Sequence, residues 1–168
     1  MIRSREARKR AEQILEAVGI REAAVDVHRV AEFLGFTVIE FDFPDATAGL
    51  TFIEGEVKTI GVNSKHARVR QRFSIGHELG HYLMGHENYD HGATYVEERP
   101  SFLDPQHRQE VEANEFSAQL LMPPTMLKRD VSEIGLDSAA LAKRYEVSEQ
   151  AMWIQLIDLG RAKQHANN

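Results

Sequence analysis

The spacing of hydrophobic residues divides the first third of the chain into helical segments followed by extended ones. Apolar positions at helical spacing, ended by Gly19, predict an amphipathic helix over residues 4–18. A second, shorter helix is expected over residues 26–34, with Asp26 as its N-cap and Gly35 just beyond its last turn. Both helices precede the first run of β-branched residues.

Three runs rich in β-branched and aromatic residues then follow, over residues 36–41, 48–53 and 57–62. Such runs are typical of strands. The short Glu-Gly-Glu segment over residues 54–56 indicates a hairpin between the second and the third strand. We therefore expect a small, mostly antiparallel three-stranded sheet that packs on helices.

Helical spacing returns after the sheet. It predicts a helix over residues 65–84, capped by Asn63-Ser64, and another over residues 107–121 that ends at a Met-Pro-Pro run. Residues 87–106 between them have no period, so we expect a long loop there, and long loops in compact domains are often functional.

The C-terminal part has the pattern of a helical subdomain. We expect at least one helical turn over residues 125–131, and helices over residues 138–145 and 149–159. Ser148 is the expected N-cap of the last helix and Gly160 its end, followed by a polar tail. The fold class is therefore α+β, with one domain over residues 1–124 and a helical subdomain over residues 125–168.

The last two predicted helices resemble a helix-turn-helix unit. In a DNA-binding unit, the second helix presents polar or basic side chains to the bases. Here that helix carries Glu149, Trp153 and Asp158, and its first basic residue is Arg161. Because carboxylates suit a phosphate-lined groove poorly, we interpret the unit as structural or partner-binding.

Composition narrows the classes of function. The 168 residues are 42% hydrophobic and 27% charged, which is typical of a globular protein, and the net charge of -6 disfavours general nucleic-acid binding. No apolar run is long enough for a signal peptide or a membrane span. Since the chain has no cysteine, disulfides and thiol chemistry are excluded, and we expect a cytoplasmic protein.

The helix predicted over residues 65–84 carries a His-Glu-x-x-His pattern. His77 and His81 are four residues apart, so both imidazoles face one side of the helix and can bind one metal ion. Glu78 flanks that face, where a general base takes a proton from the attacking water. Gly76 and Gly80 each weaken the helix, which indicates close approach of substrate, metal or another backbone.

A catalytic metal needs a third protein ligand and an open position. Glu110 and Asn114 are four residues apart on the helix predicted over residues 107–121, so they can face one site together. We expect Glu110 to bind the metal and Asn114 to accept a hydrogen bond from a ligating histidine. Glu112 is the main alternative ligand.

Residues 70–83 (Arg-Gln-Arg-Phe-Ser-Ile-Gly-His-Glu-Leu-Gly-His-Tyr-Leu) resemble the core of the ImmA/IrrE family of metallo-endopeptidases, and residues 110–123 resemble its second motif. The resemblance implies a gluzincin-like fold, with zinc bound by His77, His81 and Glu110. It also implies Glu78 as the base. Known members of the family cleave helix-turn-helix repressors and thereby switch on mobile-element or stress-response genes.

We therefore expect a zinc endopeptidase with one Zn²⁺ per chain, although imidazole and carboxylate ligands also accept Mn²⁺ and Fe²⁺. The expected partner is a protein substrate, a helix-turn-helix repressor, and we expect the chain to bind neither nucleic acid nor a membrane. For contacts to the substrate or the oxyanion we favour Tyr95, Arg99 and His91 in the predicted loop. His86 is expected to be a solvated residue at the helix end. The alternative is a non-enzymatic regulator with a structural or vestigial metal site, acting by partner or DNA binding.

Overall fold

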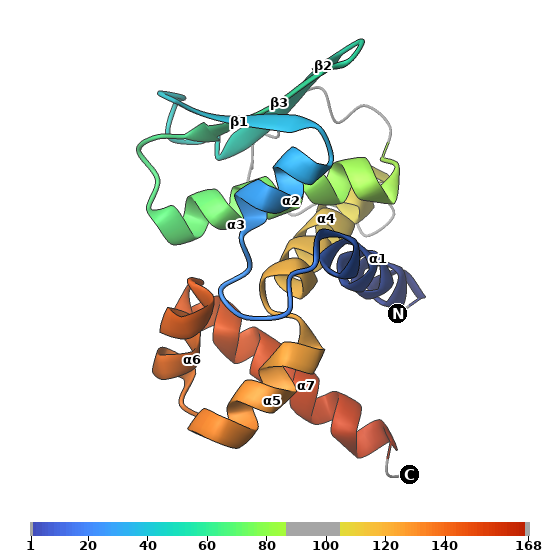
Figure 1. The fold of residues 1–168 in the computed structure, drawn as a ribbon, viewed down its shortest axis with the longest axis vertical. Coiled ribbons are helices and arrows are strands. Elements are labelled where there is room, and N and C mark those ends of the chain that lie inside the picture. Colours follow the sequence, from blue (N-terminus) through green and yellow to red (C-terminus); the bar gives the residue numbers. More distant parts are fainter. Residues whose placement is uncertain (1, 87–104, 167–168) are drawn as a thin grey trace.

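The computed structural model describes residues 2–86 and 105–166, which form a three-stranded sheet over layers of helices (Figure 1). The sheet lies at one end of the molecule, and three C-terminal helices lie at the other. The elements are α1 (Ile2–Val18), α2 (Val27–Phe33), β1 (Phe36–Phe41), β2 (Gly49–Glu54), β3 (Val57–Asn63), α3 (Arg68–Met84), α4 (Pro105–Leu121), α5 (Pro124–Ile134), α6 (Ser138–Tyr145) and α7 (Glu149–Ala166). The predicted α+β class is confirmed.

The sheet is mixed rather than mostly antiparallel as expected. The strand order is β1-β3-β2, with β1 parallel to β3 and β2 antiparallel to β3. The β2–β3 hairpin could be predicted from its short turn. The connection over residues 42–48, however, carries the chain from β1 to the far edge of the sheet, so that β3 returns between the two other strands in the direction of β1.

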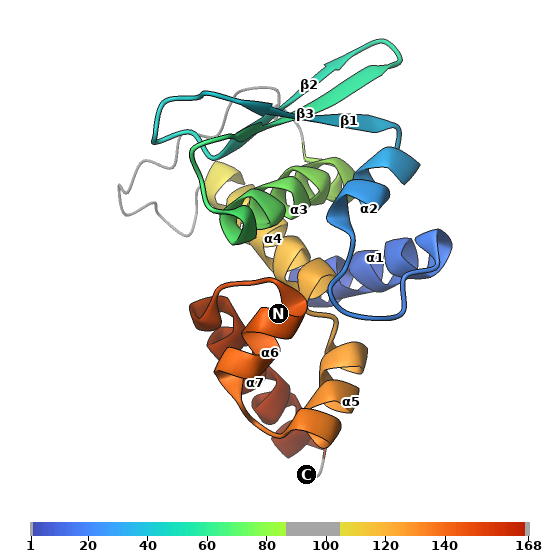
Figure 2. The same ribbon diagram turned by 60° about the vertical axis from the view of Figure 1, so that its left-hand side comes forward.

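α3 lies between the sheet and α4, and α1 packs on the other side of α4 (Figures 1 and 2). This central position explains why a helix that carries two histidines and a glutamate is buried over most of its length. In β3, the central strand, Ile60 and Val62 are buried. They form a continuous hydrophobic core with Ile75 and Leu79 of α3. The sheet and α4 therefore pack against α3 from two sides.

The start of α3 differs from the expectation. The helix begins at Arg68 after Ala67, and no side chain caps it. The side chain of Asn63 is not a helix cap, because its Oδ1 accepts a hydrogen bond from the backbone N–H of Lys65. Its Nδ2 holds the connection between β1 and β2 by donating to three backbone carbonyl oxygens, those of Phe43, Pro44 and Thr47.

Other helix ends follow their sequence signals. Asp26 accepts from the N–H of Arg29 at 3.0 Å, and Ser148 Oγ accepts from the N–H of Ala151 at 3.1 Å, as N-caps do. The prediction that the last helix stops at Gly160 is wrong, because α7 continues to Ala166. A glycine inside a helix costs only about 1 kcal/mol, so it ends a helix only where other signals agree.

Two glycines let α3 and α4 approach closely. A Cβ atom built on Gly76 would lie 2.5 Å from Ser117 Oγ. A Cβ atom on Gly80 would lie 3.0 Å from both the Cα and the carbonyl oxygen of Ala113. Ser117 also donates a hydrogen bond across this interface to the carbonyl oxygen of Phe73, at 2.9 Å. The close approach lets polar side chains of α3 and α4 contact one another between the two helices.

The three C-terminal helices form a group of their own (Figure 2), and hydrogen bonds join it to the rest of the chain. The buried guanidinium of Arg72 in α3 donates to the carbonyl oxygens of Val25 and Glu146, at 2.9 and 3.1 Å. Gln155 in α7 donates to the carbonyl oxygen of Met122, at 3.0 Å. The division of the chain after residue 124 and the helix-turn-helix character of α6 and α7 stay predictions.

A buried carboxylate joins α5 to α6. Asp130 of α5 is fully buried and accepts from Tyr145 Oη at 2.8 Å, from Arg144 Nε at 3.0 Å and from Arg129 Nε at 3.1 Å. Burial alone would raise the pKa of Asp130. The hydrogen bonds from Tyr145 and Arg129 and the charge of Arg144 outweigh it, so the pKa lies below its ordinary value.

Candidate metal centre

Three potential metal ligands meet where α3 crosses α4. His77 Nε2 lies 3.2 Å from Glu110 Oε2, and His81 Nε2 lies 3.2 Å from Glu110 Oε1. The two Nε2 atoms are 2.9 Å apart. Both imidazoles are buried, whereas the carboxylate of Glu110 is 34% exposed. Of the residues expected to bind metal, the structure thus brings all three to one point.

The donor set fits a divalent metal ion such as zinc. Two ligand atoms about 2.0–2.1 Å from a tetrahedral zinc ion lie roughly 3.3 Å apart, close to the distances of 2.9–3.2 Å between the two Nε2 atoms and from each of them to a carboxylate oxygen of Glu110. Within residues 2–86 and 105–166, this group of one carboxylate and two imidazoles is the candidate cluster, and its ligand atoms all lie within 4.8 Å of one another. Two nitrogen ligands and one carboxylate match a catalytic zinc site with an open position.

Asn114 holds the first imidazole. Its Oδ1 atom lies 2.9 Å from His77 Nδ1. An amide oxygen only accepts, so Nδ1 of His77 carries the donated proton and Nε2 is directed at Glu110 and His81. One turn of α4 therefore contributes both Glu110 and the residue that orients His77, as the four-residue spacing predicted.

The predicted base is buried beside the ligands. Glu78 is 4% exposed, and its Oε2 accepts a hydrogen bond of 2.7 Å from Thr51 Oγ1 in β2. The sheet thus contributes to the site through Thr51, a residue that the sequence did not single out. A polar residue in the middle of a strand that faces the helix of the candidate ligands is the signal that could have found it.

The pKa values of the site's side chains follow from burial and from pairing with neighbouring groups. Burial alone would raise the pKa of Glu110, but hydrogen bonds from His77 and His81 outweigh it and hold the pKa at about 2. Burial would lower the pKa of His77, but its bond to Glu110 and the charge of Glu78 raise it. Burial raises the pKa of Glu78, opposed by the charge of His77 and the bond from Thr51. Glu110 is therefore a carboxylate at neutral pH.

The expectation that His86 is solvated is wrong. Its side chain is buried, with Nδ1 at 3.0 Å from His81 Nδ1 and Nε2 at 3.0 Å from Glu112 Oε2. Glu112, the alternative ligand, thus contacts His86 and lies outside the cluster of candidate ligands. The signal for this arrangement is Gly85, whose left-handed backbone turns the chain back at the end of α3.

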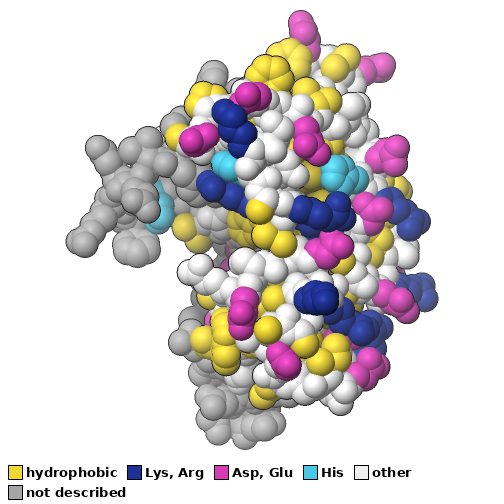
Figure 3. All heavy atoms as spheres, turned by 90° about the vertical axis from the view of Figure 1, so that its left-hand side faces the viewer, with side chains coloured by type: hydrophobic (Ala, Val, Ile, Leu, Met, Phe, Trp, Pro, Cys, Tyr) yellow, Lys and Arg dark blue, Asp and Glu magenta, His cyan; other side chains and the backbone are white. Residues whose placement is uncertain are grey.

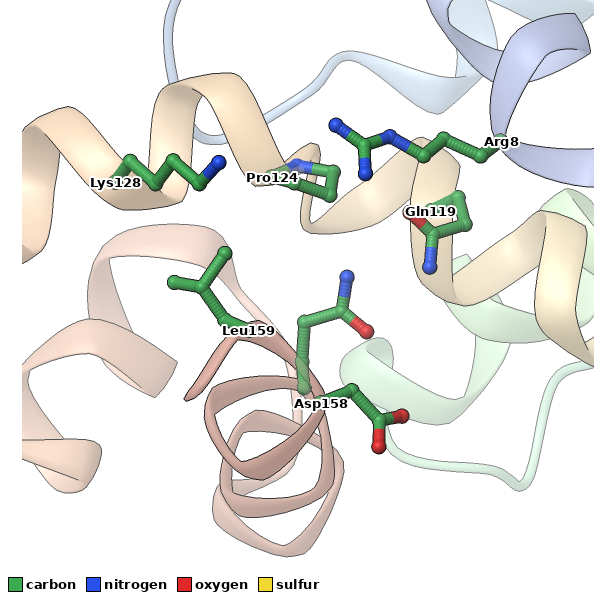
Figure 4. Close-up of a pocket in the computed structure, with 7 residues that line it drawn as sticks. Arg8, Gln119, Pro124, Lys128, Asp158 and Leu159 are labelled. Atoms are coloured by element: carbon green, nitrogen blue, oxygen red, sulfur yellow. The ribbon is translucent and has the colours of Figure 1, made fainter. Parts of the chain in front are cut away.

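The residues favoured for contacts to the oxyanion or the substrate, Tyr95, Arg99 and His91, lie outside the described residues. A small pocket between α1, α4, α5 and α7 contains none of the candidate ligands (Figure 4). Arg8, Gln119 and Lys128 line one side of it, and Asp158 and Leu159 of α7 line the other. The pocket lies where these helices meet, and it is separate from the candidate metal centre.

The surface has a mixed charge. Acidic and basic side chains are interspersed over the face in Figure 3, with hydrophobic side chains among them. In the described part of the chain, no helix has the length and apolar character needed to cross a membrane.

Comparisons with known proteins agree with the geometry. A family model described as the IrrE N-terminal-like domain, Peptidase M78, matches residues 31–156. Among solved structures, a Mycobacterium tuberculosis transcriptional regulator aligns with a TM-score of 0.62 and 16% identity, over 88% of this chain and 45% of that one. This chain thus spans less than half of the regulator, and a likeness at this identity shows a common fold. A search of curated proteins found no match.

Proposed function

Because the chain belongs, over residues 31–156, to the peptidase family of IrrE N-terminal-like domains, we propose that it is a zinc-dependent endopeptidase. The observation that carries this proposal is the contact of one carboxylate, Glu110, with both Nε2 atoms of His77 and His81, beside the buried Glu78. The resemblance of residues 70–83 and 110–123 to the two family motifs implies that Glu110, distant in the sequence, binds the metal together with the two histidines.

His77, His81 and Glu110 would hold the zinc ion. When bound, zinc supplies Lewis acidity, which polarises the scissile carbonyl and lowers the pKa of the attacking water. Among the described residues, the cluster offers three ligands, the number that the protein supplies to a catalytic zinc ion. A closed set of four would instead have favoured a structural site and the alternative of a non-enzymatic regulator.

Glu78 is the proposed general base and acid. Its carboxylate takes a proton from the attacking water and then delivers it to the amine that leaves. The hydrogen bond from Thr51 holds Oε2 of Glu78, and this leaves Oε1 to exchange the proton. Burial of Glu78 excludes bulk water and raises its pKa, which favours a group that must bind and release a proton in each cycle.

The proposed substrate is a helix-turn-helix transcriptional repressor, cut at one site, so that mobile-element or stress-response genes are switched on. The resemblance of residues 70–83 and 110–123 to peptidases with such substrates supports this choice. The lack of cysteine suits a reducing compartment and supports action in the cytoplasm.

The test is incubation of the purified, zinc-loaded protein with the repressor encoded beside its gene, followed by mass spectrometry of the fragments. We expect one cut with the wild type, no cut with Glu78→Gln despite retained zinc, and loss of both zinc and cleavage with His77→Ala. Undiminished cleavage by Glu78→Gln would remove Glu78 from the mechanism. Cleavage by zinc-free protein would contradict the metal dependence.

A further inference from the structure

We propose that His86 and Glu112 are a positioning pair that fixes the tautomer and the orientation of His81, so that Nε2 of His81 faces the metal. The inference rests on the metal centre proposed above and adds two residues to it. It starts from a feature that the proposed reaction does not use: a buried histidine in contact with both a buried glutamate and a candidate ligand.

The turn at the end of α3 places His86 against the helix it has just left. Gly85 adopts a left-handed conformation with φ of 69°. The N–H of Gly85 then bonds to the carbonyl oxygen of Tyr82, and the N–H of His86 bonds to that of His81. This pair of bonds is the Schellman motif, which folds the chain back across the last helical turn. The backbone thus brings the His86 ring to the His81 ring, with centroids 5.0 Å apart.

The contacts define a direction for the protons. A carboxylate only accepts, so the bond between Glu112 Oε2 and His86 Nε2 places the proton on Nε2 of His86. A neutral imidazole has one N–H, so Nδ1 of His86 is then an acceptor. The contact between the Nδ1 atoms of His86 and His81 therefore requires the proton on Nδ1 of His81. Nε2 of His81 also bonds to Glu110, and once the proton of that bond is displaced by a zinc ion, Nε2 would present its lone pair to the metal.

The two candidate histidine ligands are thus oriented by different means. His77 donates from Nδ1 directly to the amide oxygen of Asn114. His81 donates from Nδ1 to a neutral histidine, whose own acceptor state depends on Glu112. Since α4 carries Glu110, Glu112 and Asn114, one helix supplies a ligand and the orienting contacts of both others. Removal of such an orienting contact commonly costs about 10–100-fold in metal affinity.

The test measures zinc affinity by competition with a chelator, which does not depend on catalysis. Glu112→Leu removes the acceptor for His86 and should weaken zinc binding about 10–100-fold. Glu112→Gln is the matched control, because its amide oxygen still accepts from His86 Nε2, and it should stay close to the wild type. His86→Asn places an amide oxygen where Nδ1 was, as Asn114 does for His77, and should also keep most of the affinity.

A double-mutant cycle separates positioning from a merely structural role. If Glu112 acts through His86, Glu112→Leu should cost much less zinc affinity in the His86→Asn background than in the wild type. Nitrogen NMR of the zinc-loaded wild type should find His86 protonated at Nε2 and not at Nδ1. A His86 proton on Nδ1 would overturn the proposal, as would equal zinc affinity of Glu112→Leu and wild type. Failure of the wild type to bind zinc would overturn the metal centre as well.

Discussion

The contact between α3 and α4 makes Gly80 the position where a single methyl group should disturb the metal centre most. In Gly80→Ala the new Cβ would lie 3.0 Å from both the Cα and the carbonyl oxygen of Ala113, and 3.2 Å from the Cβ of Phe116. Carbon atoms in ordinary contact are about 3.5–4.0 Å apart, so the two helices must separate by a few tenths of an ångström. Ala113 lies between Glu112 and Asn114, so these two residues and the candidate ligand Glu110 on the same helix move with it.

The free energy of unfolding has two opposing contributions. Overpacking of a core commonly costs about 1–3 kcal/mol, and replacing glycine by alanine inside a helix gains about 1 kcal/mol. We therefore expect Gly80→Ala to destabilise the protein by about 0–2 kcal/mol. The matched control is Gly160→Ala in α7, where a new Cβ meets no atom within 4 Å. That variant should be more stable than the wild type by about 1 kcal/mol.

Zinc affinity decides whether the displacement reaches the site. Since disturbing the residues that orient metal ligands commonly costs about 10–100-fold in metal affinity, we expect zinc binding to weaken about 10-fold in Gly80→Ala and to stay unchanged in Gly160→Ala. Urea unfolding of the metal-free proteins and chelator competition with zinc measure the two quantities. The reasoning would be refuted if Gly80→Ala gained as much stability as Gly160→Ala and bound zinc as the wild type does.

Two further predictions concern other parts of the molecule. Thr51→Val removes the hydroxyl bond to Glu78 while keeping the shape of the side chain. A hydrogen bond to a charged group contributes about 1.5–3 kcal/mol, so we expect kcat for repressor cleavage to fall roughly 10–100-fold with zinc affinity unchanged. An unaltered kcat would contradict the role of Thr51. Asp130→Asn should reduce stability at pH 7 by about 1–3 kcal/mol. Because the pKa of Asp130 lies below its ordinary 3.8, the wild type keeps this contribution above that pH and loses it in stronger acid. Urea unfolding should therefore show the difference in free energy of unfolding between the two proteins narrowing from pH 5 to pH 2. A constant difference would contradict this reasoning.

Much of the fold could be predicted because local signals and tertiary packing agree. The run over residues 36–41 is the observed β1, and α6 has the predicted bounds. Asp26 and Ser148 cap helices as expected, since each side-chain oxygen accepts from the backbone N–H three residues later in its own segment. The candidate ligands could be found for a similar reason, because a spacing of four residues on a helix already places two side chains on one face.

The errors lie where distant segments decide. Whether β1 pairs parallel or antiparallel depends on the path of the connection after it, which no local pattern records. Asn63 has the sequence of a cap, yet three carbonyl oxygens of the preceding connection compete for its amide. His86 looks like a helix-end residue, and its burial depends on Glu112 of another helix. Each case needs the tertiary structure to choose among several local possibilities.

The most direct test of the account is a crystal structure of the zinc-loaded protein with anomalous scattering measured at the zinc absorption edge. We predict one peak about 2.0–2.2 Å from Nε2 of His77, Nε2 of His81 and a carboxylate oxygen of Glu110. A peak out of reach of Glu110, or none between these three side chains, would contradict the metal centre from which the proposed peptidase activity follows.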